Sequence, residues 1–261
     1  MTQLSSGKAP DVLAVTGGAN GIGLEVARQW LNKGGQVILL DLRAEALNAA
    51  VDQLGNQVRG IVVDVTDSES VEAAVDDIAR QEGKLNGLVN CAGFARHARL
   101  ENLDDGDFQA LFEVHLGGTL RMCRAAYPLL QQAAQQDEGA AVVNSSSVAG
   151  INGTPGRASY GTAKAGIAGM TRTLAVEWGG DAIRVNAVSP GPTRTALVDD
   201  LIVRQEIQLE PLTKRTPLGR MPTVDEVAAP IVFLCSLAAS FITGTCLPID
   251  GGLTIEGNWY G

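Results

Sequence analysis

The sequence VLAVTGGANGIG, residues 12–23, joins an apolar run to a glycine-rich turn, and a helical pattern follows it. Gly17, Gly21 and Gly23 permit the backbone angles of a tight turn and let the main chain approach a ligand closely. The positive end of the following helix suits a pyrophosphate. The spacing G-x-x-x-G-x-G is a weak signal alone, so a plain structural turn is the alternative. The position between a strand and a helix favours a dinucleotide site.

Strand and helix patterns alternate along the whole chain, as in βαβ units that build a parallel sheet. The predicted strands span Val12–Thr16, Gln36–Leu40, Val58–Val63, Leu88–Asn90, Ala141–Asn144, Arg184–Val188 and Cys246–Ile249. Helical patterns cover about 22–33, 44–54, 68–81, 107–134, 158–178 and 224–236. Continuous Val, Ile and Leu content fits strands covered on both faces. No linker or repeat interrupts the alternation, and we expect one domain over residues 1–261.

The segment from Thr195 to Met221 breaks this alternation. It is long and mixed in polarity, and it contains Pro211, Pro217 and Gly219. It lies between a strand and a helix, where doubly wound sheets place loops that cover a ligand. We therefore expect a substrate lid at about residues 195–221.

Composition excludes several classes of protein. The formal charge of −9 argues against a nucleic-acid surface, which needs clustered Lys and Arg. No apolar run is long enough to cross a bilayer, and residues 1–10 lack the apolar stretch of a signal peptide. The 4 cysteines are scattered, without C-x-x-C pairs or histidines at metal-ligand spacing. We expect a cytoplasmic protein with reduced thiols and no metal site.

Asp41 ends the second predicted strand, 18 positions after Gly23. An acidic residue there is placed to bond the adenosine ribose, and its charge would repel the phosphate of NADP. Arg43 could receive that phosphate, but the nearby positions 19 and 42 hold alanine and leucine and not basic residues. The pattern favours NAD over NADP. A solvated carboxylate at a strand end is the alternative for Asp41.

Tyr160 and Lys164 lie four residues apart, on one face of a predicted helix. A neighbouring ammonium favours the phenolate, and a fall of about 3 pKa units corresponds to roughly 4 kcal/mol. Ser147 follows a predicted strand, 13 residues before Tyr160, at the edge where open α/β sheets bind ligands. Its hydroxyl could donate to a substrate oxygen while Tyr160 exchanges the proton. An incidental Tyr and Lys on a helix is the alternative.

Together these motifs resemble the short, single-domain branch of the short-chain dehydrogenase/reductase family over about residues 10–255. The resemblance rests on Thr16-to-Gly23, Asp64, Asn90-Cys91-Ala92-Gly93, Ser147, Tyr160 with Lys164, Asn186-to-Gly191, Ile242-Thr243-Gly244 and Asp250-Gly251-Gly252. It implies a Rossmann-type, doubly wound α/β fold with a seven-stranded parallel sheet flanked by helices. It also implies a homotetramer.

The resemblance further implies that Ser147 holds the substrate oxygen and that Tyr160 donates or accepts the proton. Lys164 would lower the pKa of Tyr160 and bind the nicotinamide ribose. The other residues implied in NAD binding are Gly17, Asn20, Gly21, Ile22, Gly23, Asp41, Asp64, Val65, Asn90, Ala92, Gly93, Pro190, Gly191, Thr193 and Thr195.

His115 departs from the family pattern, which has asparagine at this position. That asparagine supports a water linking the lysine to bulk solvent. Histidine donates and accepts hydrogen bonds and titrates near neutrality. Our hypothesis is that His115 is a catalytic residue of the proton relay and adds a pH dependence to activity. A core histidine bonded to backbone is the alternative.

These observations predict an NAD-dependent oxidoreductase that transfers a hydride between nicotinamide and a secondary alcohol or ketone carbon of a small substrate. Basic residues in the expected substrate region favour a polyol, a sugar or an anionic hydroxy compound, unless they are only solvated surface charges. They are Arg96, His97, Arg99, Arg157, Arg194, Lys214 and Arg215. A 3-oxoacyl thioester reductase remains open. So does a catalytically weak NAD-sensing regulator, although such a protein is expected to lack Ser147, Tyr160 or Lys164.

Overall fold

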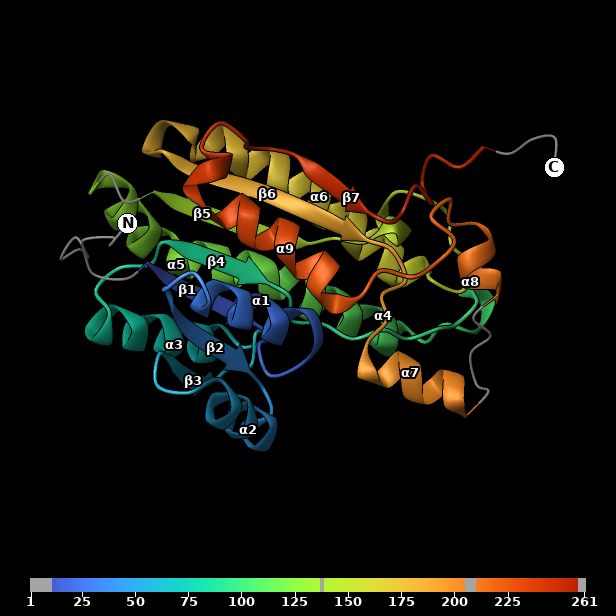
Figure 1. Cartoon of the computed structure of the whole chain (residues 1–261), viewed down its shortest axis with the longest axis horizontal. Coiled ribbons are helices and arrows are strands. Elements are labelled where there is room, and N and C mark those ends of the chain that lie inside the picture. The colour runs from blue at the N-terminus through green and yellow to red at the C-terminus, as the bar shows by residue number, and fades with distance from the viewer. Residues whose placement is uncertain (1–10, 137–138, 205–209, 258–261) are drawn as a thin grey trace, which may run out of the picture.

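One parallel sheet organises the molecule in the computed structural model, which describes residues 11–136, 139–204 and 210–257 (Figure 1). Its seven strands lie in the order β3-β2-β1-β4-β5-β6-β7. Their bounds are β1 Val12–Thr16, β2 Gln36–Asp41, β3 Val58–Val62, β4 Gly87–Asn90, β5 Ala140–Ser145, β6 Ile183–Pro190 and β7 Cys246–Ile249. The predicted sheet is confirmed, with each strand within two residues of its expected ends. The order reverses at β1, which pairs with β2 on one side and β4 on the other. Ligands of open α/β sheets bind at such a switch point.

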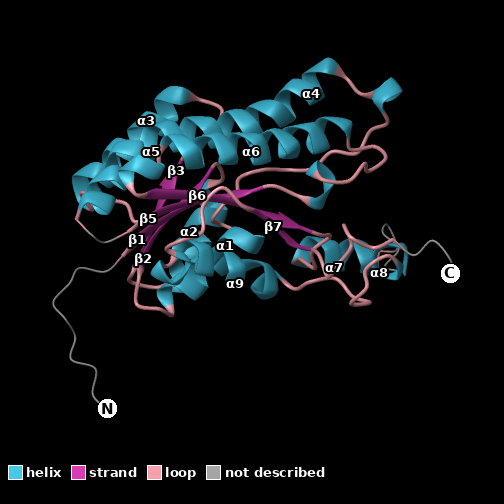
Figure 2. Cartoon of the chain, turned by 90° about the horizontal axis from the view of Figure 1, so that it is seen from above, coloured by secondary structure: helices cyan, strands magenta, loops and turns pink. Residues whose placement is uncertain are grey.

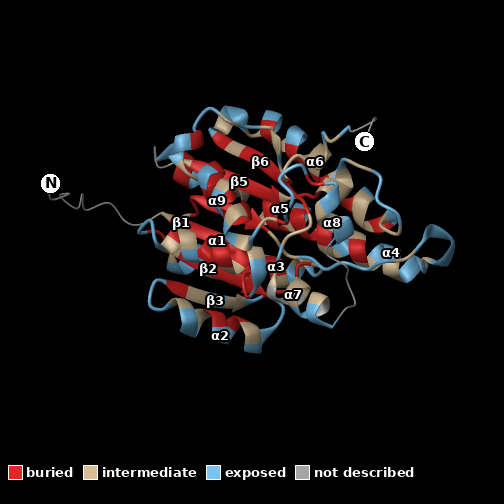
Figure 3. Cartoon of the chain, turned by 45° about the vertical axis from the view of Figure 1, so that its right-hand side comes forward, coloured by how far each residue is buried: buried red, intermediate tan, exposed pale blue. Residues whose placement is uncertain are grey.

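Helices cover both faces of the sheet (Figure 2). Because side chains alternate along a strand, Leu13 and Val15 of β1 enter one buried cluster and Val12 and Ala14 enter the other. The first face carries α1 Gly21–Leu31, α2 Ala44–Leu54 and α9 Val224–Cys235. The second face carries α3 Ser68–Gln81, α5 Gly118–Gln135 and α6 Ala158–Glu177. The central strands are buried along their length, whereas the edge strand β3 is only partly covered (Figure 3).

Local sequence signals set several helix starts. The Asp67 side chain accepts a hydrogen bond from the Glu69 amide at the start of α3. Asp104 accepts from two amides at the start of α4 Asp105–Phe112. Thr223 and Glu226 form a capping box at α9, with each side chain bonded to the other's backbone amide. Short 3₁₀ turns span Leu100–Asn102, Val148–Gly150, Gly179–Asp181 and Leu237–Ala239.

The single helix expected over 107–134 is interrupted. A π-helical turn, Glu113–Gly117, separates α4 from α5. A Cβ at Gly118 would lie 2.7 Å from a Val65 methyl carbon, so glycine lets α5 begin against the loop after β3. π-helical turns concentrate at functional sites, and this one contains His115.

The segment 195–221 is more regular than expected. It contains α7 Ala196–Val203 and α8 Glu210–Lys214, which lie beyond the carboxyl ends of the strands (Figure 1). Its two ends are held together, because the Arg194 amide donates to the Pro222 carbonyl oxygen at 2.9 Å. Within the described ranges, no helix is long and apolar enough to cross a membrane.

Candidate active site

The turn after β1 forms a cradle that has room for an anion. Gly17 and Gly21 have φ of +64° and +55°, values that favour glycine. A Cβ at Gly17 would lie 2.9 Å from the Ala92 backbone, whereas one at Gly21 would meet nothing within 4 Å. The first amides of a helix lack carbonyl partners, and Asn20 provides no side-chain cap for α1. The first turn of α1 also carries no acidic residue. Gly17, Asn20, Gly21, Ile22 and Gly23 therefore fit a pyrophosphate.

Asp41 is held beside this cradle. One carboxylate oxygen accepts from the Ala19 amide at 3.2 Å, and the other accepts from the Arg43 amide at 3.1 Å. The Arg43 guanidinium lies 3.6 Å from the second oxygen. The carboxylate is thus a fixed negative charge at the end of β2. Asp64 is engaged locally, because it accepts from the amide and hydroxyl of Thr66.

Polar side chains join the carboxyl ends of β1, β4 and β5. The Thr16 hydroxyl oxygen accepts from the Cys91 and Ala92 amides at 3.1 Å each. Asn90 donates to the Asn144 side-chain oxygen at 2.9 Å, and its own side-chain oxygen is buried without a partner in the described part of the chain. This orphaned acceptor lies beside the Cys91–Gly93 turn. It is the kind of atom that a bound ligand or water satisfies.

The carboxyl end of β6 supplies the other predicted cofactor residues. Pro190 ends the strand, and the Gly191 amide donates to the Ile249 carbonyl oxygen at 3.0 Å. The Thr193 hydroxyl donates to the Gly191 carbonyl oxygen, and the Thr195 hydroxyl caps α7. Val65 is buried against Gly118. These residues and the glycine cradle belong to the same edge of the sheet, which fits a dinucleotide laid across it.

Ser147, Tyr160 and Lys164 converge at this edge. Ser147 lies near enough to Tyr160 to lower the pKa of its phenol, and the Lys164 ammonium lies 5.5 Å from the centre of the Tyr160 ring. The ammonium donates to the Ser145 carbonyl oxygen at 2.6 Å. The Ser146 hydroxyl donates to the Lys164 carbonyl oxygen at 2.8 Å. Ser145 and Ser146, which the sequence did not single out, thus hold the lysine at both its backbone and its ammonium group.

Burial shifts the pKa values of both Tyr160 and Lys164. It raises the pKa of Tyr160 above its ordinary value of 10, against the Ser147 hydrogen bond and the Arg157 charge, which both lower it. Burial also lowers the pKa of Lys164 from 10.5 to about 8. The predicted fall of the Tyr160 pKa is therefore wrong for this arrangement, because desolvation of the phenolate outweighs the favourable charges. The phenol keeps its proton at neutral pH.

His115 contacts Tyr160 directly. Its ring stands edge-on to the Tyr160 ring, with centroids 5.3 Å apart. Its Nε2 lies 2.6 Å from the Phe94 carbonyl oxygen and 3.3 Å from the Phe94 amide nitrogen. The carbonyl contact is much the shorter, and a carbonyl oxygen can only accept, so we assign the proton to Nε2. Nδ1 then carries the lone pair, and it has no hydrogen-bond partner among the described residues. Burial, with the Lys164 charge, lowers the pKa of His115 to about 3. The predicted titration near neutrality is wrong, and the backbone-bonded histidine is what the structure contains.

Three of the seven basic residues expected around a substrate are paired with carboxylates. Arg96 forms an ion pair with Asp107, Arg99 with Glu101 and Arg194 with Asp199. Arg157 differs, because its guanidinium lies over the Tyr160 ring. Within the described residues, no group of three or more His, Cys, Asp or Glu side chains could hold a metal ion.

A switch-point cradle for a dinucleotide beside a Ser, Tyr and Lys set defines the class of nucleotide-binding oxidoreductases with a tyrosine at the reacting oxygen. The family model described as "Enoyl-(Acyl carrier protein) reductase" matches residues 17–254. The chain belongs to the short-chain dehydrogenase/reductase family.

The proteins that the chain resembles include a polyol dehydrogenase and 3-oxoacyl reductases. The chain is 39% identical to D-threitol dehydrogenase of Mycolicibacterium smegmatis, across 94% of this chain and 93% of that protein. It is 37% identical to the 3-oxoacyl-[acyl-carrier-protein] reductase FabG of Thermotoga maritima, across 94% and 98%. The structure of a Brucella melitensis 3-ketoacyl-(acyl-carrier-protein) reductase complexed with NADH matches with a TM-score of 0.87 and 25% identity, across 94% and 98%. The chain is accordingly an oxidoreductase that interconverts a secondary alcohol and a ketone.

Proposed function

We propose that this oxidoreductase uses NAD to oxidise a small hydroxylated substrate, with Ser147, Tyr160 and Lys164 as its catalytic residues. The observation that carries the proposal is the approach of both Ser147 and Lys164 to Tyr160 at the sheet edge where the glycine cradle lies. The similarity to D-threitol dehydrogenase supports a polyol or sugar, and an anionic hydroxy compound has the same reacting group. Retention of the whole set disfavours a catalytically silent NAD sensor.

In this mechanism the protein positions one oxygen and moves one proton. Ser147 and Tyr160 hydrogen-bond the substrate oxygen together. Because the phenol is protonated, it donates directly to a carbonyl oxygen in reduction. In oxidation it must first lose that proton, and the Ser147 hydrogen bond and the Arg157 charge favour its loss. When bound, the oxidised cofactor would accept the hydride in oxidation, and the reduced cofactor would donate it in reduction.

Asp41 supports NAD rather than NADP. Its carboxylate is buried and doubly bonded to backbone amides, so it cannot swing away from a 2′-phosphate. The Arg43 guanidinium faces Asp41 and is neutralised by it. The remaining cofactor contacts proposed for Asp64, Val65, Asn90, Gly93 and Thr195 follow from their places along the same edge.

We further propose that His115 is a positioning residue for Tyr160. A neutral ring with its proton on Nε2 cannot relay by titrating, but the free Nδ1 can accept a hydrogen bond from a water near Lys164. His115→Asn and His115→Leu separate these roles. Loss of turnover in the leucine variant and its recovery in the asparagine variant would support an acceptor. Unchanged turnover and pH profile in both variants would show that His115 neither positions Tyr160 nor accepts a hydrogen bond that the reaction needs.

Other parts of the proposal concern the whole chain. The segment 195–221 serves as the substrate lid of a single domain, because its anchored ends carry α7 and α8 over the strand ends. All 4 cysteines are free thiols, which supports a cytoplasmic location.

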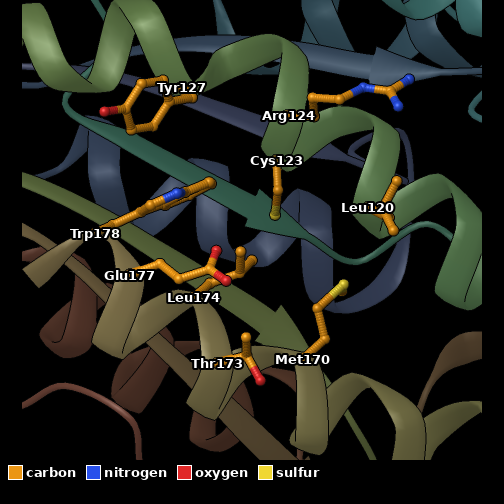
Figure 4. A pocket seen from close by; sticks show the side chains of 9 residues that line it. All are labelled: Leu120, Cys123, Arg124, Tyr127, Met170, Thr173, Leu174, Glu177 and Trp178. Atoms are coloured by element: carbon orange, nitrogen blue, oxygen red, sulfur yellow. The ribbon is translucent and has the colours of Figure 1, made fainter.

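A groove of about 500 Å³ between α5 and α6 supports a homotetramer. Apolar side chains line much of it, including Leu120, Met170, Leu174 and Trp178 (Figure 4).

The test is absorbance at 340 nm while the enzyme and NAD, or NADP, meet polyols, sugars, sugar acids and secondary alcohols. Formation of NADH that Tyr160→Phe abolishes and Tyr127→Phe preserves would support the proposal. Tyr127 is a suitable control because it lies on α5 and bonds Asp181. A silent panel together with rapid NADPH-dependent reduction of a 3-oxoacyl thioester would favour the second candidate, which the Thermotoga maritima relative supports.

A further inference from the structure

Arg157 lies on the catalytic tyrosine. Its guanidinium carbon is 5.6 Å from the centre of the Tyr160 ring. The backbone at this point is fixed, because the Arg157 amide donates to the Thr154 carbonyl oxygen at 3.1 Å and Ala98 bridges to Arg157. The preceding Gly156 has a φ of +74° and packs against the His97 ring. The structure thus holds this cation beside the Tyr160 ring.

The Arg157 guanidinium has no carboxylate partner within the described ranges, unlike the arginines around it. It donates to the Arg96 carbonyl oxygen at a long 3.4 Å. Arg96 itself is neutralised by Asp107, and Arg99 by Glu101. Arg157 is also half-buried. A guanidinium presents five donors in a planar fork that matches an oxyanion, so most of its donors remain available for a ligand.

We propose that Arg157 binds an oxyanion carried by the substrate, so that the substrate is a secondary alcohol or ketone with a carboxylate or similar group near the reacting carbon. The inference rests on the proposed function, because it takes Tyr160 as the group that bonds the reacting oxygen. Arg157 and Tyr160 are adjacent, and one small molecule can therefore meet both. The acidic protein as a whole, with a formal charge of −9, repels anions, and an unpaired arginine at the reacting centre is the local exception.

Arg157 also acts on Tyr160 in a way that does not depend on the charge of the substrate. The Arg157 charge lowers the pKa of Tyr160 and could assist proton transfer for every substrate equally. Pairs of substrates that share a skeleton and differ in one charge distinguish the two roles. Suitable pairs are threonate with threitol, and 3-hydroxybutanoate with 1,3-butanediol. A hydroxyalkane sulfonate and glycerol phosphate, used as competitive inhibitors, report which oxyanion the site prefers.

The experiment measures kcat/KM for both members of each pair with NAD in the wild type, Arg157→Gln, Arg157→Lys and Arg99→Gln. We expect the wild type to prefer the acid, and Arg157→Gln to reduce the acid-to-neutral ratio by about 10- to 100-fold, as for loss of a charged hydrogen bond. Arg157→Lys should retain part of the preference. Arg99→Gln, which removes an exposed and paired arginine, should leave the ratio unchanged.

Other outcomes overturn the inference. A wild type that prefers the neutral member of each pair contradicts it directly. An equal loss for both members in Arg157→Gln, with a displaced pH profile, would assign Arg157 to the pKa of Tyr160 alone. If neither member of any pair is oxidised, the proposed function itself fails and the inference falls with it.

Discussion

A single charge at Asp41 should decide the cofactor. In Asp41→Ser the repulsion of a 2′-phosphate disappears and the Arg43 guanidinium loses its partner. Juxtaposed like charges cost several kcal/mol, so the ratio of kcat/KM for NADP to that for NAD should rise by about 30-fold or more. Steady-state kinetics with both cofactors measure it. Glu45→Gln, an exposed acid in the first turn of α2, is the matched control. An unchanged ratio in Asp41→Ser would contradict the assignment of NAD.

The buried ammonium of Lys164 should lower the free energy of unfolding of the protein. Its pKa is about 8 in the folded protein, against 10.5 for a solvated lysine, so the unfolded chain binds more protons between these values and stability rises with pH there. Below pH 8 the full cost of burying the ammonium remains, about 3 kcal/mol from the pKa difference. Lys164→Met should therefore abolish turnover and yet raise the free energy of unfolding at pH 7.

Urea unfolding of both proteins at pH 7 and at pH 10 measures this effect. The stability gap between Lys164→Met and the wild type should narrow at pH 10, where the lysine of the folded protein is neutral. A wild type that is the more stable of the two at pH 7 would show that the bond to the Ser145 carbonyl oxygen outweighs the cost of burial.

The sequence predicted which residues meet at the site, and it did not predict their protonation. Spacing along a helix places Tyr160 and Lys164 together, and a strand end places Ser147 opposite them. Burial of each ring and ammonium depends on segments far away in the chain, such as the Phe94 backbone over His115. For that reason the fall expected for the pKa of Tyr160 and the titration near neutrality expected for His115 were both wrong. The role of Ser145 and Ser146 was also hidden, because it depends on a carbonyl and a backbone bond.

At the scale of elements, the π-helical turn that contains His115 packs tightly against the loop after β4, which contains Gly93. A Cβ at Gly93 would lie 2.1 Å from a carbon of the His115 ring, a distance that forces one of them to move. Gly93→Ala should destabilise the protein by about 1–3 kcal/mol, as overpacking does, and should lower turnover by displacing the ring from Tyr160. Thermal unfolding and NADH formation measure the two effects.

Two further variants make this test specific. His115→Asn shortens the side chain, so the double variant Gly93→Ala with His115→Asn should regain stability relative to Gly93→Ala alone. Gly153→Ala, where an added Cβ would meet nothing within 4 Å, should be neutral. Equal destabilisation by Gly93→Ala with and without His115→Asn would show that the clash lies elsewhere.

Hydrophobic periodicity predicted the positions of the helices better than it predicted a π-helical turn within one of them. The pattern over 107–134 is apolar at helical spacing throughout, and nothing in it marks the π-helical turn at Glu113–Gly117. The segment 195–221 shows the opposite error. Its prolines and glycine indicate a loop, but Pro211 lies in the first turn of α8, where proline is tolerated.

At the scale of the whole molecule, strand order follows from the sequence because right-handed βαβ crossovers and one switch point leave few alternatives. Association does not follow in the same way, since it depends on which apolar side chains remain uncovered after folding. In the groove between α5 and α6, Leu120 is 45% exposed, on a helix whose other face packs on the sheet.

We expect a second copy of the chain to cover this groove. Leu120→Arg places a charge where an apolar contact would form, and a buried unpaired charge is costly. Multi-angle light scattering should therefore find a tetramer in the wild type and about half or a quarter of that mass in Leu120→Arg. Val62→Arg changes an exposed residue on the edge strand β3, away from the groove, and should keep the wild-type mass. Because the proposed catalytic residues Ser147, Tyr160 and Lys164 come from one chain, Leu120→Arg should retain NADH formation wherever its subunits stay folded. A tetramer that survives Leu120→Arg would show that the subunits meet through another face.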